Sequence, residues 1–130
     1  MPPLTSDDAL ALSKSFRDLS AAITDYRLKN SSSLSEDDRK ALEEKEWELL
    51  NASTDMVTKA VGLTLDESEA AGKKVQGAAA TAARAVKTLK EVRKVITIAA
   101  AAVGLAAAIA SKDPGAIAKN GKAVLDAATA

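Results

Sequence analysis

The sequence predicts an all-α protein: an antiparallel helical bundle of three to four helices with a long, alanine-rich third helix. Apolar residues recur every three or four positions along most of its 130 residues, which is the period of an amphipathic helix. Six glycines and three prolines are too few for the many turns of an all-β chain. We expect one domain over residues 1–130, made of an amphipathic helical base (1–94) and an apolar helical hairpin (95–130).

The first helix is expected from about Ser6 to Lys29. The Ser6 hydroxyl can cap the amides of the first turn, and two aspartates follow it at the positive end of the helix dipole. One apolar stripe then repeats at spacings of three and four residues: Ala9, Leu12, Phe16, Leu19, Ile23 and Tyr26. The helix should end where the short polar side chains of residues 30–35 compete for backbone hydrogen bonds.

The second helix is expected to begin at Ser35, because a serine with an acid three residues later resembles a capping box. Its apolar seam repeats every seven residues: Leu42, Leu49, Met56 and Leu63. Ten of the 13 residues in the range 36–48 are charged, so this half should face water. Gly62 is a C-cap candidate, and Thr64 with Glu67 forms a second capping-box pattern, so we place the next turn there.

The third helix is expected from Leu65 or Asp66 to about Ser111. Its apolar spacing continues through five residues: Val75, Ala79, Ala82, Val86 and Leu89. Its second half, residues 95–110, carries no charge and reads VITIAAAAVGLAAAIA.

The fourth helix is expected to follow Asp113, which can act as its N-cap, with Pro114 at the first helical position. It should run to about Thr129. One face of it is apolar: Ile117, Gly121, Val124, Leu125 and Ala128.

Two positions stay open for the turn between the second and third helices. A turn near Thr64 makes residue i of the second helix face about residue 128 − i of the third, which places the acidic stretch 36–48 beside residues 80–92. The apolar segment then extends past the hairpin of the first two helices. A turn near Gly72–Gly77, where each glycine costs about 1 kcal/mol in a helix, instead places that segment inside an ordinary four-helix bundle.

The apolar segment 95–110 is the candidate functional surface. A helix that is apolar all round needs burial on every side, and one amphipathic helix covers only part of it. We expect a partner to cover the rest, either a second copy of the chain or another helical protein. The residues expected to meet this partner are Val95, Ile96, Ala99, Ala100, Val103, Gly104, Ala107 and Ile109.

A lipid surface is the third alternative for covering this segment. Small residues recur at Ala100, Gly104 and Ala108, a spacing that packs membrane helices. The 17 residues between Lys94 and Lys112 fall short of the ~20 residues of a spanning helix. Because the segment has this small-residue pattern but is short for a spanning helix, a membrane-inserting helical hairpin, toxin-like or coating a lipid surface, is an alternative function and not the leading one.

Composition argues against most enzyme and nucleic-acid classes. A chain without Cys or His has no disulfide framework, zinc finger or Ser-His-Asp triad. Carboxylate pairs such as Glu44 and Glu48 occur, but di-metal centres in helical bundles usually add histidine ligands. With 18 acidic and 18 basic residues, the chain lacks the basic excess of a nucleic-acid binder. We expect no catalytic residue, no cofactor, no metal and no nucleic-acid partner.

We therefore expect a non-enzymatic protein that acts through protein–protein contact, by self-association through residues 95–110. An inhibitor or immunity-like protein that offers its acidic second helix to a basic target is a further alternative. Trp47 on that helix is expected to cap the core rather than to form a recognition hot spot. The acidic N-terminus lacks the apolar stretch of a secretory signal, so we expect a cytoplasmic protein, with secretion by a route without a cleaved signal left open.

Overall fold

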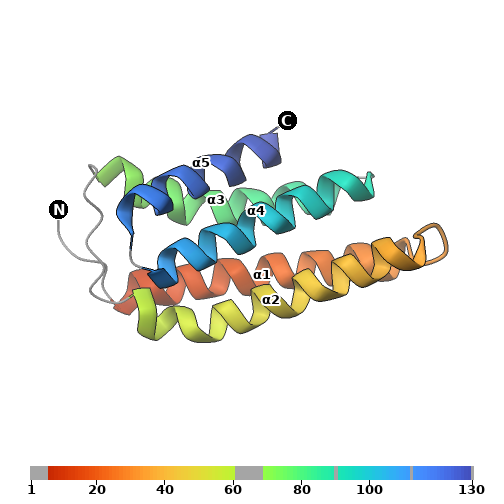
Figure 1. The fold of residues 1–130 in the computed structure, drawn as a ribbon, viewed down its shortest axis with the longest axis horizontal. Helices are drawn as coiled ribbons and strands as arrows, with labels where there is room; N and C mark the ends of the chain where they lie inside the picture. The colour runs from red at the N-terminus through yellow and green to blue at the C-terminus, as the bar shows by residue number, and fades with distance from the viewer. Residues whose placement is uncertain (1–5, 61–68, 90, 112, 130) are drawn as a thin grey trace.

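The described residues of the chain fold into α-helices (Figure 1). The computed structural model describes residues 6–60, 69–89, 91–111 and 113–129. These residues form five helices rather than the predicted three to four, and no strand occurs among them. The helices are α1 (Ser6–Lys29), α2 (Glu36–Ala60), α3 (Glu69–Thr88), α4 (Val92–Ser111) and α5 (Pro114–Thr129).

Local signals place both ends of α1 and the starts of α2 and α5 correctly. The prediction of α1 over Ser6–Lys29 is confirmed. Ser35 Oγ accepts the backbone N–H of Asp38 at 3.1 Å, which satisfies an amide of the first turn of α2. At the start of α5, Asp113 Oδ1 accepts the N–H of Gly115 at 3.0 Å. The predicted cap at Gly62 and the second capping box lie outside the described residues.

The predicted long third helix is two helices, and this prediction was wrong. α3 closes with Leu89 N–H donating to the Ala85 carbonyl at 3.1 Å, and α4 opens with the N–H groups of Lys94 and Val95 donating to Glu91 O at 3.1 and 3.3 Å. The break at residues 89–91 holds no glycine or proline. Because the chain reverses here, the apolar segment returns along the bundle instead of extending beyond it. The alternative turn at Gly72–Gly77 is also wrong, since both glycines lie inside α3.

The described helices pack as a ring. α1 contacts α2 and α3, α4 contacts α2 and α5, and α5 also contacts α3. Figure 1 shows α4 between α5 and α2, with α1 and α3 behind. Within the described residues α2 and α3 are not neighbours, so the predicted pairing of residues 36–48 with residues 80–92 is wrong. The extra turn accounts for this difference, because it makes α4 rather than α3 the neighbour of α2.

The core lies along the inside of this ring. Its largest fully buried side chains come from all five described helices: Leu12, Phe16, Leu19 and Ile23 of α1, Leu42 and Leu49 of α2, Val86 of α3, Val95, Ile98, Leu105 and Ile109 of α4, and Ile117 of α5. Buried residues of α3 are mostly alanine, which lets helix backbones approach closely. The predicted apolar stripe of α1 is confirmed from Leu12 to Tyr26, while the Ala9 side chain lies outside the described ones.

A polar seam, which no pattern in the sequence indicated, joins α1 to α2. The Glu46 carboxylate is 11% exposed and accepts hydrogen bonds from Arg27 Nε at 2.6 Å and from the Thr24 hydroxyl. Ser20 Oγ donates to the Glu46 carbonyl at 2.9 Å, and Ser13 Oγ donates to the Ser53 carbonyl at 2.7 Å. The hydrogen bond to Glu46 raises the pKa of Arg27 above its ordinary value. These bonds fix how α1 and α2 align along their length.

Candidate functional site: an apolar outer face on α4

The eight predicted interaction residues divide into two groups. Val95 and Ala99 are 0% exposed and Ile109 is 1% exposed, so these three side chains pack inside the bundle. This burial removes them from any surface that the bundle could offer to a partner. The other five are half-buried or exposed: Ile96, Ala100, Val103, Gly104 and Ala107.

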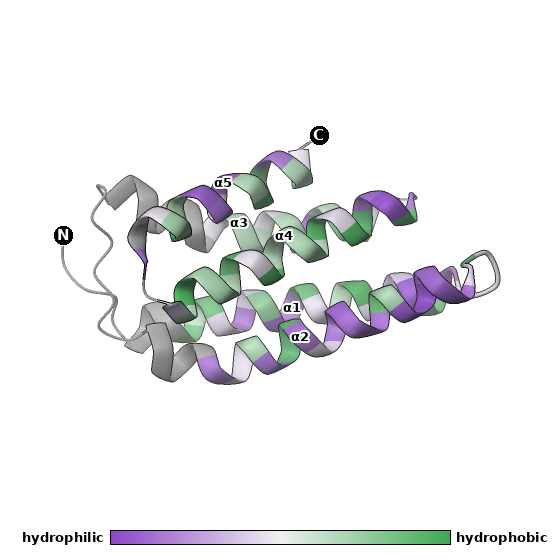
Figure 2. Cartoon of the chain, viewed as in Figure 1, coloured by the Kyte–Doolittle hydropathy of each residue, from purple (hydrophilic) through white to green (hydrophobic). Residues whose placement is uncertain are grey.

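The accessible residues follow one stripe of α4. Ile96, Ala100, Val103, Ala107 and Ala110 recur at spacings of four, three, four and three residues, and we call this set the outer α4 face. At 1.5 Å per residue the stripe is about 21 Å long. It carries no charge, although exposed Arg93 and Lys94 lie at its start. Figure 2 shows α4 as an apolar band between more polar stretches of α2 and α5.

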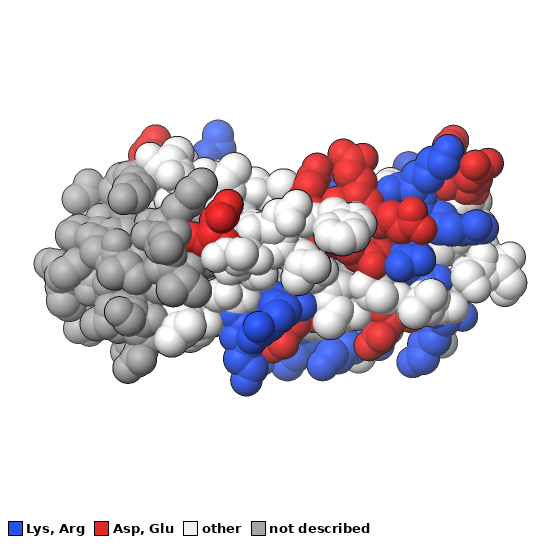
Figure 3. Space-filling model, turned by 90° about the horizontal axis from the view of Figure 1, so that it is seen from below, with Lys and Arg blue, Asp and Glu red and all other residues white. Residues whose placement is uncertain are grey.

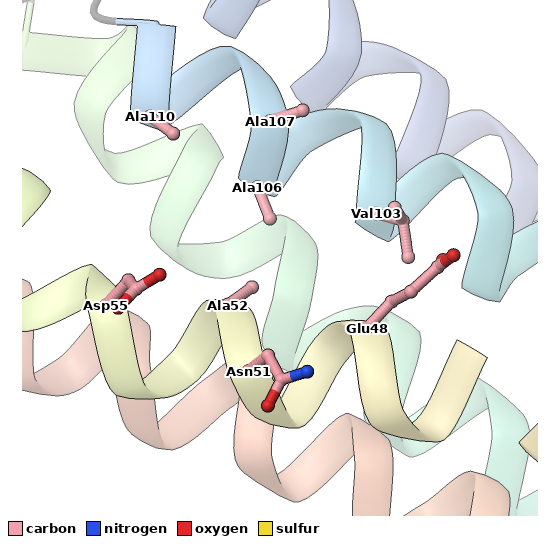
Figure 4. Close-up of a pocket in the computed structure, with 8 residues that line it drawn as sticks. All are labelled: Glu48, Asn51, Ala52, Asp55, Val103, Ala106, Ala107 and Ala110. Carbon is pink, nitrogen blue, oxygen red and sulfur yellow. The ribbon is translucent and has the colours of Figure 1, made fainter. Parts of the chain in front are cut away.

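On one side, the outer α4 face borders a groove against α2. This groove has a cavity volume of about 250 Å³. Its residues are Glu48, Asn51, Ala52 and Asp55 of α2, with Val103, Ala106, Ala107 and Ala110 of α4. In the close-up of Figure 4, Ala52 points up toward α4 while Val103 and Ala106 point down toward α2. The groove therefore has an apolar floor of small side chains and a polar wall supplied by α2.

On the other side, α4 packs tightly against α5 at Gly104. A Cβ atom at this position would lie 2.9 Å from Oδ1 of Asn120, a separation that real Cβ atoms do not show. Asn120 is itself held by a hydrogen bond from its Nδ2 to the Ala116 carbonyl at 2.7 Å. Ala108, of the same small-residue pattern, is buried. Two of the three small residues that suggested membrane packing thus serve contacts within the chain.

The helices that flank α4 differ in charge. α2 contains eight acidic and four basic residues, whereas α5 contains two lysines and one aspartate. Glu44 and Asp55 of α2 are exposed, as are Lys119 and Lys122 of α5. The apolar stripe is therefore bordered by an acidic helix on one side and by exposed lysines on the other.

Large apolar side chains are also exposed on α2. Trp47 is 65% exposed and Leu50 is 39% exposed. The prediction that Trp47 caps the core is therefore wrong, because its ring projects from the polar half of the helix. Figure 3 shows acidic side chains gathered beside uncharged surface near the middle of the face seen from below, with acidic and basic side chains mixed at its right-hand end.

A second, wider groove lies between α1 and α3 beside the only tyrosine. Its volume is about 490 Å³, and it is lined by residues that include Asp25, Tyr26, Lys29 and Lys87. Tyr26 is 6% exposed. Burial raises the pKa of Tyr26 above 10.0, and the charges of Asp38 and Glu91 raise it further. Among the described residues, no group of three or more acidic side chains could hold a metal ion.

α4 is also long and apolar enough to cross a membrane. Its 20 residues have a mean hydropathy of 1.9 over the most apolar window, and 44% of that window is buried in the bundle. A core helix of a soluble protein passes the same test, so length and composition do not by themselves assign α4 to lipid. Comparisons with protein-family models, with curated proteins and with solved structures found no match to this chain.

Proposed function

We propose that this protein is a non-enzymatic helical-bundle protein that associates with a second copy of itself through the outer α4 face. The observation that carries the proposal is the uncharged stripe on the outside of the bundle, from Ile96 to Ala110. Contiguous apolar surface on a soluble domain is typical of an interaction site. The alanines on this stripe allow two helices to approach closely, and half-buried Ile96 and Val103 supply the larger side chains.

Size measurements on the Ala107→Glu variant test this proposal. Ala107 is exposed in the protomer, so a glutamate can fit there without disturbing the core, yet it would place a charge in the centre of the contact. We expect the wild-type chain to sediment as a dimer or larger species at micromolar concentration and the variant to sediment as a monomer with unchanged helix content.

A matched control distinguishes a local effect from a general effect of added charge. Ala21 is an exposed alanine on α1, and the Ala21→Glu variant should associate as the wild type does. A wild-type chain that stays monomeric, or an Ala107→Glu variant that associates normally, would rule out the outer α4 face as the contact.

A membrane-inserting hairpin of α4 and α5 is the second candidate, supported by the length and hydropathy of α4. Insertion requires α4 to leave α2 and α5, so that Ile98 and Leu105 exchange their protein contacts for lipid. Flotation and dye-release assays with neutral and anionic vesicles test this candidate. Self-association through the outer face predicts that the protein stays in the aqueous fraction with both vesicle types.

A further inference from the structure

A contact between two outer α4 faces can form in two symmetric ways. Both use a two-fold axis, because the same surface meets its own copy. If the axis runs along α4, the two α4 helices are parallel, and α2 of each protomer faces α5 of the other. If the axis crosses α4, the helices are antiparallel, so α2 faces α2 and α5 faces α5. The charges on the flanking helices differ between the two arrangements.

Contacts within the protomer show which charges lie at the same level along α4. In the groove between α2 and α4, Glu48 lies beside Val103 and Asp55 lies beside Ala110 (Figure 4), so α2 and α4 run in the same direction, as Figure 1 also shows. On the opposite side of α4, Gly104 lies against Asn120 of α5. Exposed Lys119 and Lys122 are neighbours of Asn120 in the chain. Carboxylates and lysines thus lie at matching heights on the two sides of the apolar stripe.

These charges disfavour the antiparallel arrangement. It would bring two α2 helices together, each with twice as many acidic as basic residues, and the lysines of α5 would meet lysines. Within α2, Lys45 Nζ already pairs with Glu48 at 3.2 Å, but exposed Glu44 adds another carboxylate on the same side. In the parallel arrangement the acidic side of α2 meets lysines instead. Such exposed pairs stabilise little, whereas repulsion between like charges rejects the wrong geometry.

Arg93 lies on the same side of α4 as the apolar stripe, so the parallel arrangement brings it toward its own copy. A crossing near Val103 leaves Arg93 ten residues away, which is about 15 Å along α4. Helices that pack at an angle have diverged at that distance from the crossing. The repulsion between the two arginines is therefore smaller than the repulsion between two α2 helices that run side by side.

We infer that two copies associate with their α4 helices parallel, so that α2 of each protomer lies against α5 of the other. This inference rests on the proposed self-association and adds its geometry. It also gives the association a dependence on ionic strength, because exposed charges are screened by salt. Added salt should weaken the dimer in the parallel arrangement and should strengthen an antiparallel one.

Cysteine cross-linking tests the orientation, because the chain contains no cysteine of its own. The Ala100→Cys and Ala107→Cys variants each place a thiol at an exposed position of the outer face. In a parallel dimer each position meets its own copy, so each variant alone should give a disulfide-linked dimer under mild oxidation. An antiparallel dimer brings residue 100 close to residue 107, so the mixture of the two variants should cross-link where the separate variants do not. The Ala21→Cys variant on α1 gives the background from random collision.

The outcomes separate this inference from the proposed function. Cross-linking of both single variants above background supports the parallel geometry. Cross-linking of the mixture without that of both single variants overturns the parallel geometry and leaves self-association standing. If the wild type is dimeric but the outer-face cysteine variants cross-link only at the background level, the outer α4 face is not the contact. A monomeric wild type would also rule out the outer α4 face as a contact.

Reversal of charge on α5 tests the parallel arrangement independently of cross-linking. The Lys119→Glu variant places an acid against acidic α2 in a parallel dimer, so its dissociation constant should rise about tenfold. An added Glu44→Lys/Glu48→Lys change should restore association. In an antiparallel dimer the α5 helices face each other, and the variant changes the net charge of α5 from +1 (two lysines and one aspartate) to −1, so their repulsion stays about the same. A dissociation constant that does not change would therefore overturn the inference.

Discussion

Two glycines, one on α3 and one on α4, differ in what surrounds them. Gly77, on α3, is exposed, and an added Cβ atom would meet nothing within 4 Å. Gly104, on α4, faces Asn120 so closely that a Cβ atom would lie 2.9 Å from its side-chain oxygen. Both glycines carry the entropic cost of glycine in a helix, but at Gly104 the missing side chain also permits the contact between α4 and α5. Sequence alone gives the first effect and not the second.

The pair of variants Gly77→Ala and Gly104→Ala tests this difference. Gly77→Ala should raise the free energy of unfolding by about 0.5–1 kcal/mol, because alanine restricts the unfolded chain and fits the open site. Gly104→Ala should gain little or lose stability, because Asn120 must move and its bond to Ala116 is disturbed. Urea denaturation followed by circular dichroism measures both, in an Ala107→Glu background so that association does not contribute. Equal gains for the two variants would contradict the close packing at Gly104.

At the scale of the element, α1 and α2 depend on a partly buried ion pair. Arg27→Met removes the guanidinium that donates to the Glu46 carboxylate, which is 11% exposed, and leaves that charge without its cation. We expect the free energy of unfolding to fall by about 2 kcal/mol. Arg17, exposed on the same helix, supplies the control, and Arg17→Met should change stability little. The double variant Arg27→Met/Glu46→Gln should recover part of the lost stability, because it no longer leaves an unpaired charge. If the effects of the two substitutions on the free energy of unfolding are strictly additive, Arg27 and Glu46 are not coupled.

The ends of the helices could be predicted where local chemistry decides them. Ser35 and Asp113 cap their helices as expected, because an N-cap needs only a side-chain oxygen next to the first turn. The break at residues 89–91 could not be predicted, since Leu89, Lys90 and Glu91 are compatible with a continuous helix. The gain that decides it is the burial of Ile98 and Leu105 against the rest of the ring, which includes α2, a helix far away in the chain. Tertiary packing of this kind leaves no local signal.

At the scale of the whole molecule, the ring explains why the candidate site was predicted only in part. Periodicity identifies residues 95–110 as apolar all round, but it does not say which helices lie beside them. With α2 and α5 on its two sides, α4 hides Val95, Ala99 and Ile109 and keeps Ala100 and Ala107 outside. One chain thus covers more of this segment than the composition suggested. The part that stays exposed is narrow, continuous and uncharged.

The pKa of Tyr26 depends on several parts of the bundle, because α1, α2, α3 and the turn before α4 all contribute residues around this side chain. The side chain belongs to α1, and its pKa is raised first by burial and then by the charges of Asp38 on α2 and Glu91 before α4. The folded protein therefore favours the neutral phenol more than the unfolded chain does. This preference contributes stability that is fully present below pH 10.0 and is lost as the pH rises through the folded-state pKa.

Titration of this single tyrosine tests whether α1, α2 and the turn before α4 meet around it. Ultraviolet absorbance of the phenolate should give a higher midpoint in the native protein than in urea, with no second tyrosine to obscure it. Lysines also titrate in this range, so stability is best compared between the wild type and Tyr26→Phe at pH 8 and above pH 10. The wild type should lose more stability than the variant over that interval, because only its phenol must ionise. A native midpoint at or below that of the unfolded chain would mean that α1, α2 and the turn before α4 do not meet around Tyr26.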